Sequence, residues 1–154
     1  VAMSTDGSRL FVGAPFDYVG PSSIGSVRVY ERVGTSWALE ALLSIGADST
    51  ARFGSAVATN AAGTLLLVGA SGTSTVYVFE RAGSSWGAPS TLTSAAIGTN
   101  AQFGGAVALA ADGSHAVVGA PRDPTGGTAS GSVAQESIAH GEATPASQRT
   151  GTEP

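Results

Sequence analysis

The sequence contains no cysteine and no lysine, and only 12% of its residues are charged. The absence of cysteine excludes disulfide bonds and thiolate metal sites, but leaves the redox compartment open. All seven basic residues are arginines scattered singly along the chain, and the formal net charge is −4. Because no basic patch could neutralise a row of phosphates, we expect no nucleic-acid partner.

Long apolar runs are also absent. No segment approaches the roughly 18 to 20 apolar residues that a membrane-spanning helix needs, so we expect no membrane span. The N-terminus lacks the charged and apolar segments of a signal peptide, although a targeting segment could have preceded Val1. Glycine, serine, threonine and alanine are abundant instead, and hydrophobic residues come in short alternating bursts. This composition is typical of an all-β chain with many turns.

A short word, Val-Gly-Ala, occurs three times at a nearly regular interval. Its glycines are Gly13, Gly69 and Gly119, which lie 56 and then 50 residues apart. "FGSAVA" at 53–58 recurs as "FGGAVA" at 103–108, with each phenylalanine 16 residues before its motif glycine. A period of about 50 residues is typical of propeller blades or solenoid turns, so these glycines are expected to have an architectural role.

Each repeated unit has the pattern of four short strands. In the second unit the expected strands cover 55–59, 65–70, 75–81 and a weaker segment at 86–92. Asp6-Gly7 and Asp112-Gly113 separate the first two strands of the outer units, and Asp-Gly is a strong hairpin signal because both positions tolerate positive φ.

The third strand of the unit is apolar on both faces. Val76 and Val78 alternate with Tyr77 and Phe79, so both faces must be covered. Four-stranded sheets that stack like blades around an axis meet this requirement. In that arrangement the motif glycine is expected where the chain turns tightly, with the following proline stiffening the exit.

Two segments, "FGSAVATNAAGTLLLVGAS" and "FGGAVALAADGSHAVVGAP", resemble the FG-GAP repeat. "GSVRVYERVGTSW" is similar to the bacterial branch of that family in particular. The resemblance covers about residues 1–133. It implies the seven-bladed propeller of integrin α-subunit heads and of many bacterial surface or secreted proteins, and an extracellular or cell-surface role in binding or adhesion. A ring of seven such blades needs roughly 350 residues, so the expected fold class is an all-β β-propeller fragment of about two and a half to three four-stranded blades.

The repeat divides the chain into units. Blade one, lacking its start, is predicted at 1–52, blade two at 53–102 and an incomplete blade three at 103–133. Residues 134–154 lose the alternation and are predicted to form an irregular or disordered tail, either because the coding sequence ends within the blade or because its frame changes. Open strand edges and apolar faces of the outer blades favour self-association.

The resemblance also raises the question of calcium. In calcium-binding FG-GAP proteins, the turn before Gly-Ala-Pro carries a series of aspartates spaced as in an EF-hand loop. The matching turns here hold one acid, none and one. A hard cation needs six or more oxygens, so we expect no metal or other cofactor, with Asp6 and Asp112 as hairpin residues.

No catalytic residue is predicted. "GSSWG" at 83–87 has the G-x-S-x-G spelling of a nucleophile elbow, but it lacks the strand-to-helix context that would make Ser85 a nucleophile. His115 and His140 have no second histidine or acid cluster at ligand spacing, so both are expected at the surface.

Two long loops after the motif glycines are the best candidates for recognition, because loops on a rigid scaffold carry binding residues. "PFDYVGPSSIG" and "PRDPTGGTASG" offer aromatic, acidic and basic side chains. The candidate binding residues are Phe16, Asp17, Tyr18, Arg122 and Asp123. A protein or glycan ligand fits such a surface, and a plain variable connection is the alternative interpretation.

Two other functions compete with a non-enzymatic extracellular binding or adhesion module. A glycan-binding lectin assembled from several chains would use Trp37 and Trp86 as stacking platforms, although their periodicity favours a place in the core. A propeller enzyme would place acids or histidines on the innermost strands. "SAVAT" and "GAVAL" contain neither.

Overall fold

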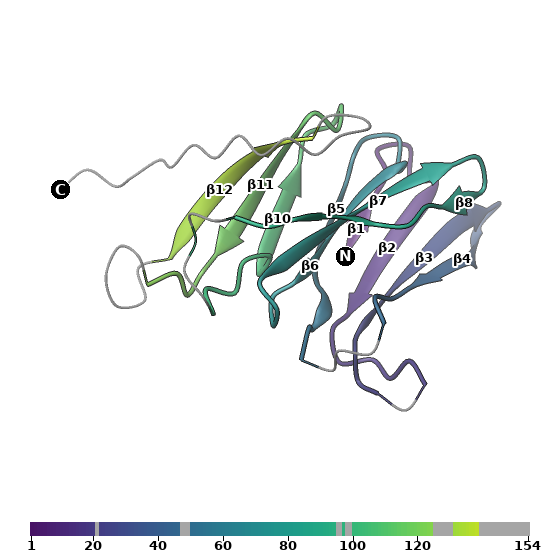
Figure 1. Ribbon diagram of the computed structural model, residues 1–154. Coiled ribbons are helices and arrows are strands. Elements are labelled where there is room, and N and C mark those ends of the chain that lie inside the picture. Colours follow the sequence, from purple (N-terminus) through teal and green to yellow (C-terminus); the bar gives the residue numbers. More distant parts are fainter. Residues whose placement is uncertain (21, 47–49, 95–96, 98–99, 125–130, 139–154) are drawn as a thin grey trace.

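The computed structural model describes residues 1–20, 22–46, 50–94, 97, 100–124 and 131–138. These residues form twelve β-strands and no helix, and therefore no helix that could cross a membrane. The strands assemble into three antiparallel sheets that follow one another along the chain (Figure 1). The predicted fold class, an all-β propeller fragment, is confirmed, while the number of blades in a complete ring stays a prediction.

Each sheet is built from consecutive strands. Sheet one contains β1 (Ala2–Met3), β2 (Arg9–Ala14), β3 (Ser26–Val33) and β4 (Ser36–Leu43) in that order. Sheet two contains β5 (Phe53–Thr59), β6 (Leu65–Ala70), β7 (Thr75–Ala82) and β8 (Ser85–Trp86), and β9 (Ser90–Leu92) also pairs with β7. Sheet three contains β10 (Ala106–Leu109), β11 (His115–Ala120) and β12 (Ser132–Ser137).

The motif glycines take equivalent places in the three sheets. Gly13 pairs with Val27, Gly69 with Val76 and Gly119 with Val133. All three glycines lie inside strands, so the expectation that they form a tight turn is wrong.

The reason for glycine is the close approach of the next sheet. A Cβ on Gly13 would lie 2.2 Å from the carbonyl oxygen of Gly54, and a Cβ on Gly69 would lie 2.0 Å from that of Gly104. No side chain fits at such a distance. The Gly-Ala and Phe-Gly words of the repeat therefore meet across two neighbouring sheets.

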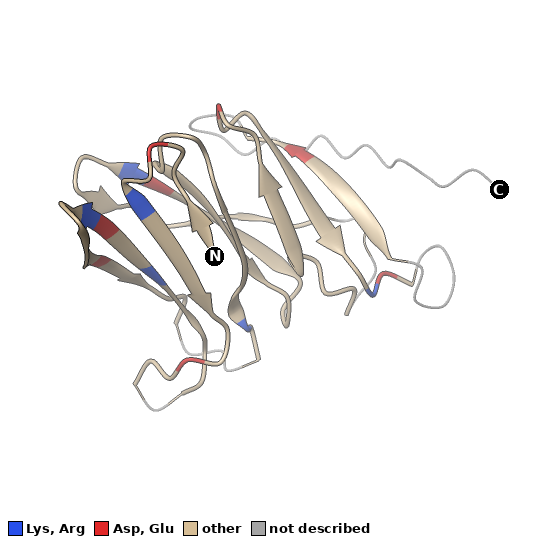
Figure 2. Ribbon diagram, turned by 180° about the vertical axis from the view of Figure 1, so that it is seen from behind, with Lys and Arg blue, Asp and Glu red and all other residues tan. Residues whose placement is uncertain are grey.

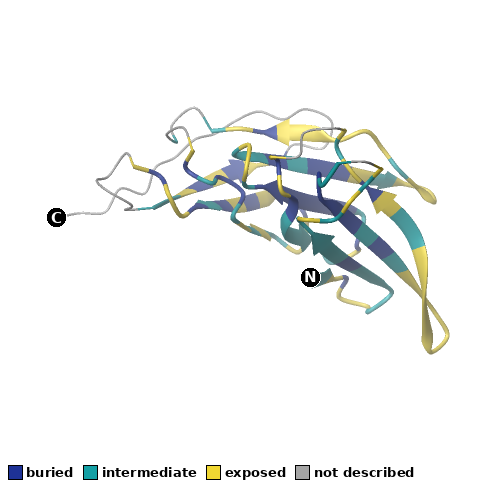
Figure 3. Ribbon diagram, turned by 90° about the horizontal axis from the view of Figure 1, so that it is seen from below, coloured by how far each residue is buried: buried dark blue, intermediate teal, exposed yellow. Residues whose placement is uncertain are grey.

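Sheet two is covered on both faces, as its sequence predicts. Strand β6 is buried over its whole length, and buried residues run through the middle of the stack (Figure 3). One face packs with sheet one in a core that contains Phe11, Val27, Val29, Phe53, Leu66, Val68 and Phe79. The other face packs with sheet three in a core that contains Leu65, Leu67, Val76, Val78, Phe103, Ala116 and Val118.

The two tryptophans differ in environment. Trp86 packs edge-on against Phe11 of sheet one, with ring centroids 5.7 Å apart, and so belongs to the core as predicted. Trp37 is 42% exposed on the edge strand β4. Trp37 is therefore not in the core of this chain, because it lies on the outer sheet and no sheet among the described residues covers it. A place between blades of a larger ring stays a prediction for Trp37.

The predicted boundary of the irregular tail is also wrong. Strand β12 continues to Ser137, which pairs with His115 of β11. Alternate residues of this strand face the core between sheets two and three, where Ala134 and Ile138 are buried. Burial and pairing together keep the chain extended through this segment, and the remainder of the predicted tail, 139–154, lies outside the described residues.

Polar contacts also join sheets one and two. Glu40 of β4 lies 3.2 Å from Nε of Arg9 in β2 and 2.6 Å from Nε of Arg81 in β7. All three side chains are at most 14% exposed. Figure 2 shows that most charged residues gather at sheet one and the adjoining part of sheet two. The Arg9–Glu40–Arg81 triad therefore adds side-chain ion pairs to a contact between the sheets that backbone hydrogen bonds also cross, such as that from the Thr5 N–H to the Ala61 carbonyl.

Candidate binding site

The two long loops leave the stack at the same end. The connection at 15–25 follows β2, and the one at 121–131 follows β11, the equivalent strand of sheet three. The strand ends from which they leave, and their described residues 15–20 and 121–124, lie at the lower end of the molecule in Figure 1. The short connection at 71–74 follows β6, so the equivalent strands of all three sheets end at this side of the stack, which we call the loop-bearing end.

In the first loop, the predicted residues have different roles. Phe16 and Tyr18 are 67% and 72% exposed and can contact a partner. Asp17 instead accepts a hydrogen bond of 2.6 Å from Ser26 Oγ and forms an ion pair of 2.8 Å with Arg28. The Ser26 hydrogen bond, with a smaller contribution from Arg28, lowers the pKa of Asp17. Asp17 therefore holds the two ends of the loop together.

The second loop is closed in the same way. Asp123 is only 1% exposed and accepts a hydrogen bond of 2.6 Å from Ser132 Oγ. Asp17 and Asp123 each lie four residues after a motif glycine, and Ser26 and Ser132 each lie thirteen after it. This shared spacing is the sequence signal of a structural Asp–Ser pair in each loop.

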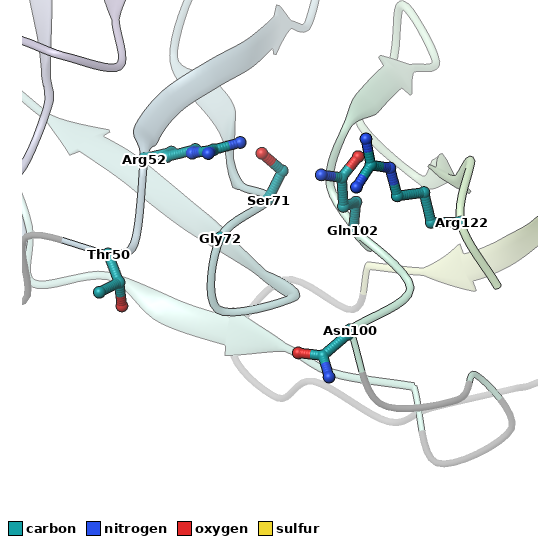
Figure 4. Close-up of a pocket in the computed structure, with 7 residues that line it drawn as sticks. All are labelled: Thr50, Arg52, Ser71, Gly72, Asn100, Gln102 and Arg122. Atoms are coloured by element: carbon teal, nitrogen blue, oxygen red, sulfur yellow. The ribbon is translucent and has the colours of Figure 1, made fainter.

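Arg122, the remaining predicted residue, lines a hollow of about 300 Å³ at the loop-bearing end, between sheets two and three. Figure 4 shows the side chains of Arg52, Ser71, Gln102 and Arg122 along one side of it. We call this hollow the loop-end pocket. Its lining residues are Thr50, Arg52, Ser71, Gly72, Asn100, Gln102 and Arg122.

Equivalent backbone contacts shape the walls of the loop-end pocket. The Gly72 N–H donates to the Ala51 carbonyl, and the Arg122 N–H donates to the Ala101 carbonyl, each at 3.0 Å. A Cβ on Gly72 would lie 1.7 Å from the carbonyl oxygen of Thr50, so the turn after β6 needs glycine there. The pocket is thus built into the contact between the sheets.

Sequence reasoning missed five side chains of this pocket. For all but Ser71, the signal lies in "TARFG" at 50–54 and "NAQFG" at 100–104, where polar residues flank an alanine just before Phe-Gly. Ala51 and Ala101 are buried, so the polar residues on either side face outward. Arg52 and Gln102 also share a left-handed backbone, with φ of 53° and 56°. The repeat therefore presents equivalent polar side chains at successive sheets.

Residues 86–133 match the sequence profile of a known family, the FG-GAP repeat. This segment is an FG-GAP repeat. It includes the Phe103-Gly104 word before β10 and the Gly119-Ala120-Pro121 word at the end of β11. The resemblance identified from the sequence is thereby confirmed. No curated protein matches the chain.

The FG-GAP scaffold brings only some of the predicted residues together. The Arg52 guanidinium lies 5.8 Å from the centroid of the Phe16 ring, which connects the first loop to the edge of the loop-end pocket. Arg122 lies in the pocket itself. Tyr18 belongs to the first loop alone, and the assignment of Phe16, Tyr18 and Arg122 to ligand binding stays a prediction.

In the hairpin turns of the first and third sheets, the aspartates form local hydrogen bonds. Asp6 accepts hydrogen bonds from Ser4 Oγ at 2.6 Å and from the Ser8 N–H at 2.9 Å, and these contacts, that of Ser4 first, lower its pKa to about 2. Asp112 accepts from the Ser114 N–H at 2.9 Å. Within the described residues, no three histidines, aspartates or glutamates gather as a metal site would require.

Proposed function

We propose that the chain is a non-enzymatic binding module of an extracellular β-propeller, which recognises a protein or glycan ligand through its loop-bearing end. One observation carries this proposal: the stacked sheets place the described ends of the two long loops and the loop-end pocket at the same end of the molecule. Rigid scaffolds with variable loops are a common arrangement for recognition. FG-GAP repeats are typical of propeller-type binding modules outside the cell.

The local structure around Ser85 supports the non-enzymatic part of the proposal. A nucleophile elbow places its serine on a sharp turn between a strand and a helix. Ser85 instead begins β8, directly after the Gly83 turn of a hairpin with β7.

The environment of Trp86 bears on the alternative of a glycan-binding lectin. Trp86 is packed against Phe11, so it does not supply a stacking platform for a sugar.

Exposed apolar side chains on the outer sheets support a larger ring. Large exposed hydrophobic residues on sheets one and three are Met3, Val33, Trp37, Leu39, Leu42, Val117 and Val133. Apolar surface of this extent is typical of faces that pack against another sheet. The proposed seven-bladed ring, or self-association of chains, would cover it. Sedimentation velocity on the isolated chain tests the second arrangement, which predicts a concentration-dependent oligomer.

A loop exchange tests recognition at the loop-bearing end. In the test variant, the short connection at 71–74 replaces residues 15–25. In the control, the turn at 60–64 replaces the turn at 110–114, which lies at the opposite end of the stack. Both proteins and the unaltered chain are applied to an array of glycans and to immobilised extracellular-matrix proteins.

We expect the unaltered chain and the control to bind the same array members and the loop variant to lose that binding. Equal binding by all three proteins, or no binding to any array member, would contradict the proposal. Circular dichroism of the three proteins shows whether the exchanges preserve the β structure.

A further inference from the structure

We propose that the loop-end pocket binds an acidic saccharide unit, with Arg52 and Arg122 holding its carboxylate or sulfate group. This inference rests on the proposed function and adds the chemical class of the ligand. The first observation behind it is the positive charge of the side chains that line the pocket. The chain has a net charge of −4, yet among the described residues that line this pocket the ionisable side chains are two arginines and no acid.

Arg52 and Arg122 differ from three other arginines of the chain in their ion pairs. Among the described residues, carboxylates lie within ion-pair distance of Arg9, Arg28 and Arg81, and of neither Arg52 nor Arg122. A guanidinium presents five N–H donors in a planar fork that matches a carboxylate or sulfate in bidentate geometry. An anionic group in the pocket would supply the acceptors that these two residues do not find within the described structure.

The rest of the lining favours a sugar over an acidic peptide. Ser71, Asn100 and Gln102 add a hydroxyl and two amides, which can donate to and accept from the hydroxyl groups of a sugar ring. The described lining residues include no aromatic or purely aliphatic side chain, and their apolar surface is limited to the Thr50 methyl group and the stems of the polar side chains. A peptide would find no pocket for an apolar anchor, which carries much of the binding energy at protein interfaces.

The size of the pocket and the hydrogen bonds that hold its walls also favour a small saccharide ligand. A hollow of about 300 Å³ lies at the lower limit for small-molecule sites, and so suits one or two sugar units. The Gly72 and Arg122 backbone hydrogen bonds hold two of its walls, and Phe16 lies against the Arg52 guanidinium. Groups held in place before binding lose less conformational entropy when the ligand arrives.

Calorimetric titration of the whole chain tests the proposal with defined probes. A sulfated heparin disaccharide and a digalacturonate distinguish the sulfate from the carboxylate, and uncharged cellobiose is the neutral comparison. We expect at least one acidic probe to bind and cellobiose not to bind. Arg52→Gln and Arg122→Gln are each expected to weaken that binding about tenfold, because each removes a charge-assisted hydrogen bond.

Arg32→Gln is the matched control, since it removes the same charge from a side chain whose Nε donates to the Gly34 carbonyl at a hairpin turn. It should change the affinity less than twofold. An equal loss of affinity in Arg32→Gln, or equal binding of cellobiose, would overturn the proposal by showing nonspecific attraction or a neutral sugar site. Binding of a polyglutamate peptide that depends on Arg52 and Arg122, with no binding of the acidic sugars, would also overturn it.

The two proposals fail in different ways. If the loop exchange abolishes binding on the array while Arg52→Gln and Arg122→Gln leave every probe and array member unaffected, the loop-end pocket is not the site and the proposed function stands. If neither the loop exchange nor the arginine variants change binding, the proposed function fails as well.

Discussion

The backbone of Gly69 in β6 lies directly against the backbone of Gly104, which precedes β10 in the next sheet. A Cβ on Gly69 would lie 2.0 Å from the carbonyl oxygen of Gly104 and 3.0 Å from its carbonyl carbon. Gly13 and Gly54 repeat the same contact between sheets one and two. The two words of the FG-GAP repeat are therefore the two halves of one contact between sheets.

Gly69→Ala should lower the free energy of unfolding by about 2 to 3 kcal/mol, because the sheets must separate to admit a methyl group. Gly119→Ala is the matched control. Its Cβ would meet the Ala106 Cβ at 3.4 Å, an ordinary contact, so its effect should stay within about 1 kcal/mol. Urea unfolding followed by circular dichroism measures both. Equal losses in the two variants would contradict a role for the contact between the sheets.

The sequence predicts the strands well because their signals are local and repeated. Alternation and the spacing of the motif glycines place β6 and β7 nearly as the structure has them, and apolar residues on both faces of 75–81 require two covering sheets. The prediction of a tight turn at Gly69 is wrong because the role of this glycine depends on a contact that is distant in sequence. Its neighbour, Gly104, lies 35 residues away, and no local pattern reports that contact.

The candidate site was predicted only in part. Arg122 was named from its loop, but the other pocket side chains come from separate segments that meet only after the sheets stack. The sequence predicts Asp17 and Asp123 as binding residues because loops on a scaffold often carry them. Their hydrogen bonds to Ser26 and Ser132 show a structural role in closing the loops, and ligand binding by either residue stays a prediction.

Glu40→Gln should lower the free energy of unfolding by about 2 kcal/mol. The substitution removes the carboxylate that, among the described residues, faces both Arg9 and Arg81, and it leaves two nearly buried guanidinium groups close together. Glu80→Gln removes the same charge from an exposed position on β7 and should change stability by less than about 0.5 kcal/mol. Thermal unfolding of the two variants at the same ionic strength tests the difference. Indistinguishable melting temperatures would show that the Arg9–Glu40–Arg81 triad adds nothing to stability.

Trp86→Ala should destabilise the protein by about 3 kcal/mol, whereas Trp37→Ala should cost less than about 1 kcal/mol. Trp86 packs against the fully buried Phe11, and its removal leaves a cavity between sheets one and two. Trp37 lies 42% exposed at a sheet edge. Urea unfolding measures the loss of stability in each alanine variant. Acrylamide quenching of Trp37→Phe and Trp86→Phe measures the solvent exposure of the one tryptophan that remains in each. Stronger quenching of Trp86 than of Trp37 would contradict the structure.

Asp6 should make stability fall in acid. Hydrogen bonds, first from Ser4 and then from Ser8, lower its pKa from 3.8 to about 2 in the folded state. The stability that these bonds contribute is therefore present above about pH 4 and is lost as the pH falls toward 2. Asp6→Asn should be less stable than the parent chain at pH 6, and the difference should shrink by pH 2. A difference that stays constant over this range would show that the carboxylate charge is not the cause.

Glu136 should have the opposite pH dependence. Its side chain is buried on β12, on the same strand face as Ala134 and Ile138, and burial raises the pKa of its carboxyl group. The folded state therefore binds the Glu136 proton more tightly than the unfolded state does. Stability from this group is present below the usual pKa of about 4.5 and is lost as the pH rises through the higher folded value.

Glu136→Gln keeps the shape of the side chain and removes its titration. At pH 7 the variant should unfold at a higher urea concentration than the parent chain, because the parent then carries a poorly solvated carboxylate in the core between sheets two and three. At pH 4, where the parent carboxyl is protonated, the two midpoints should coincide. Glu80→Gln, at an exposed position, should show no such pH-dependent difference. A parent chain that is more stable than Glu136→Gln at pH 7 would mean that the buried carboxylate has a stabilising partner in the folded chain.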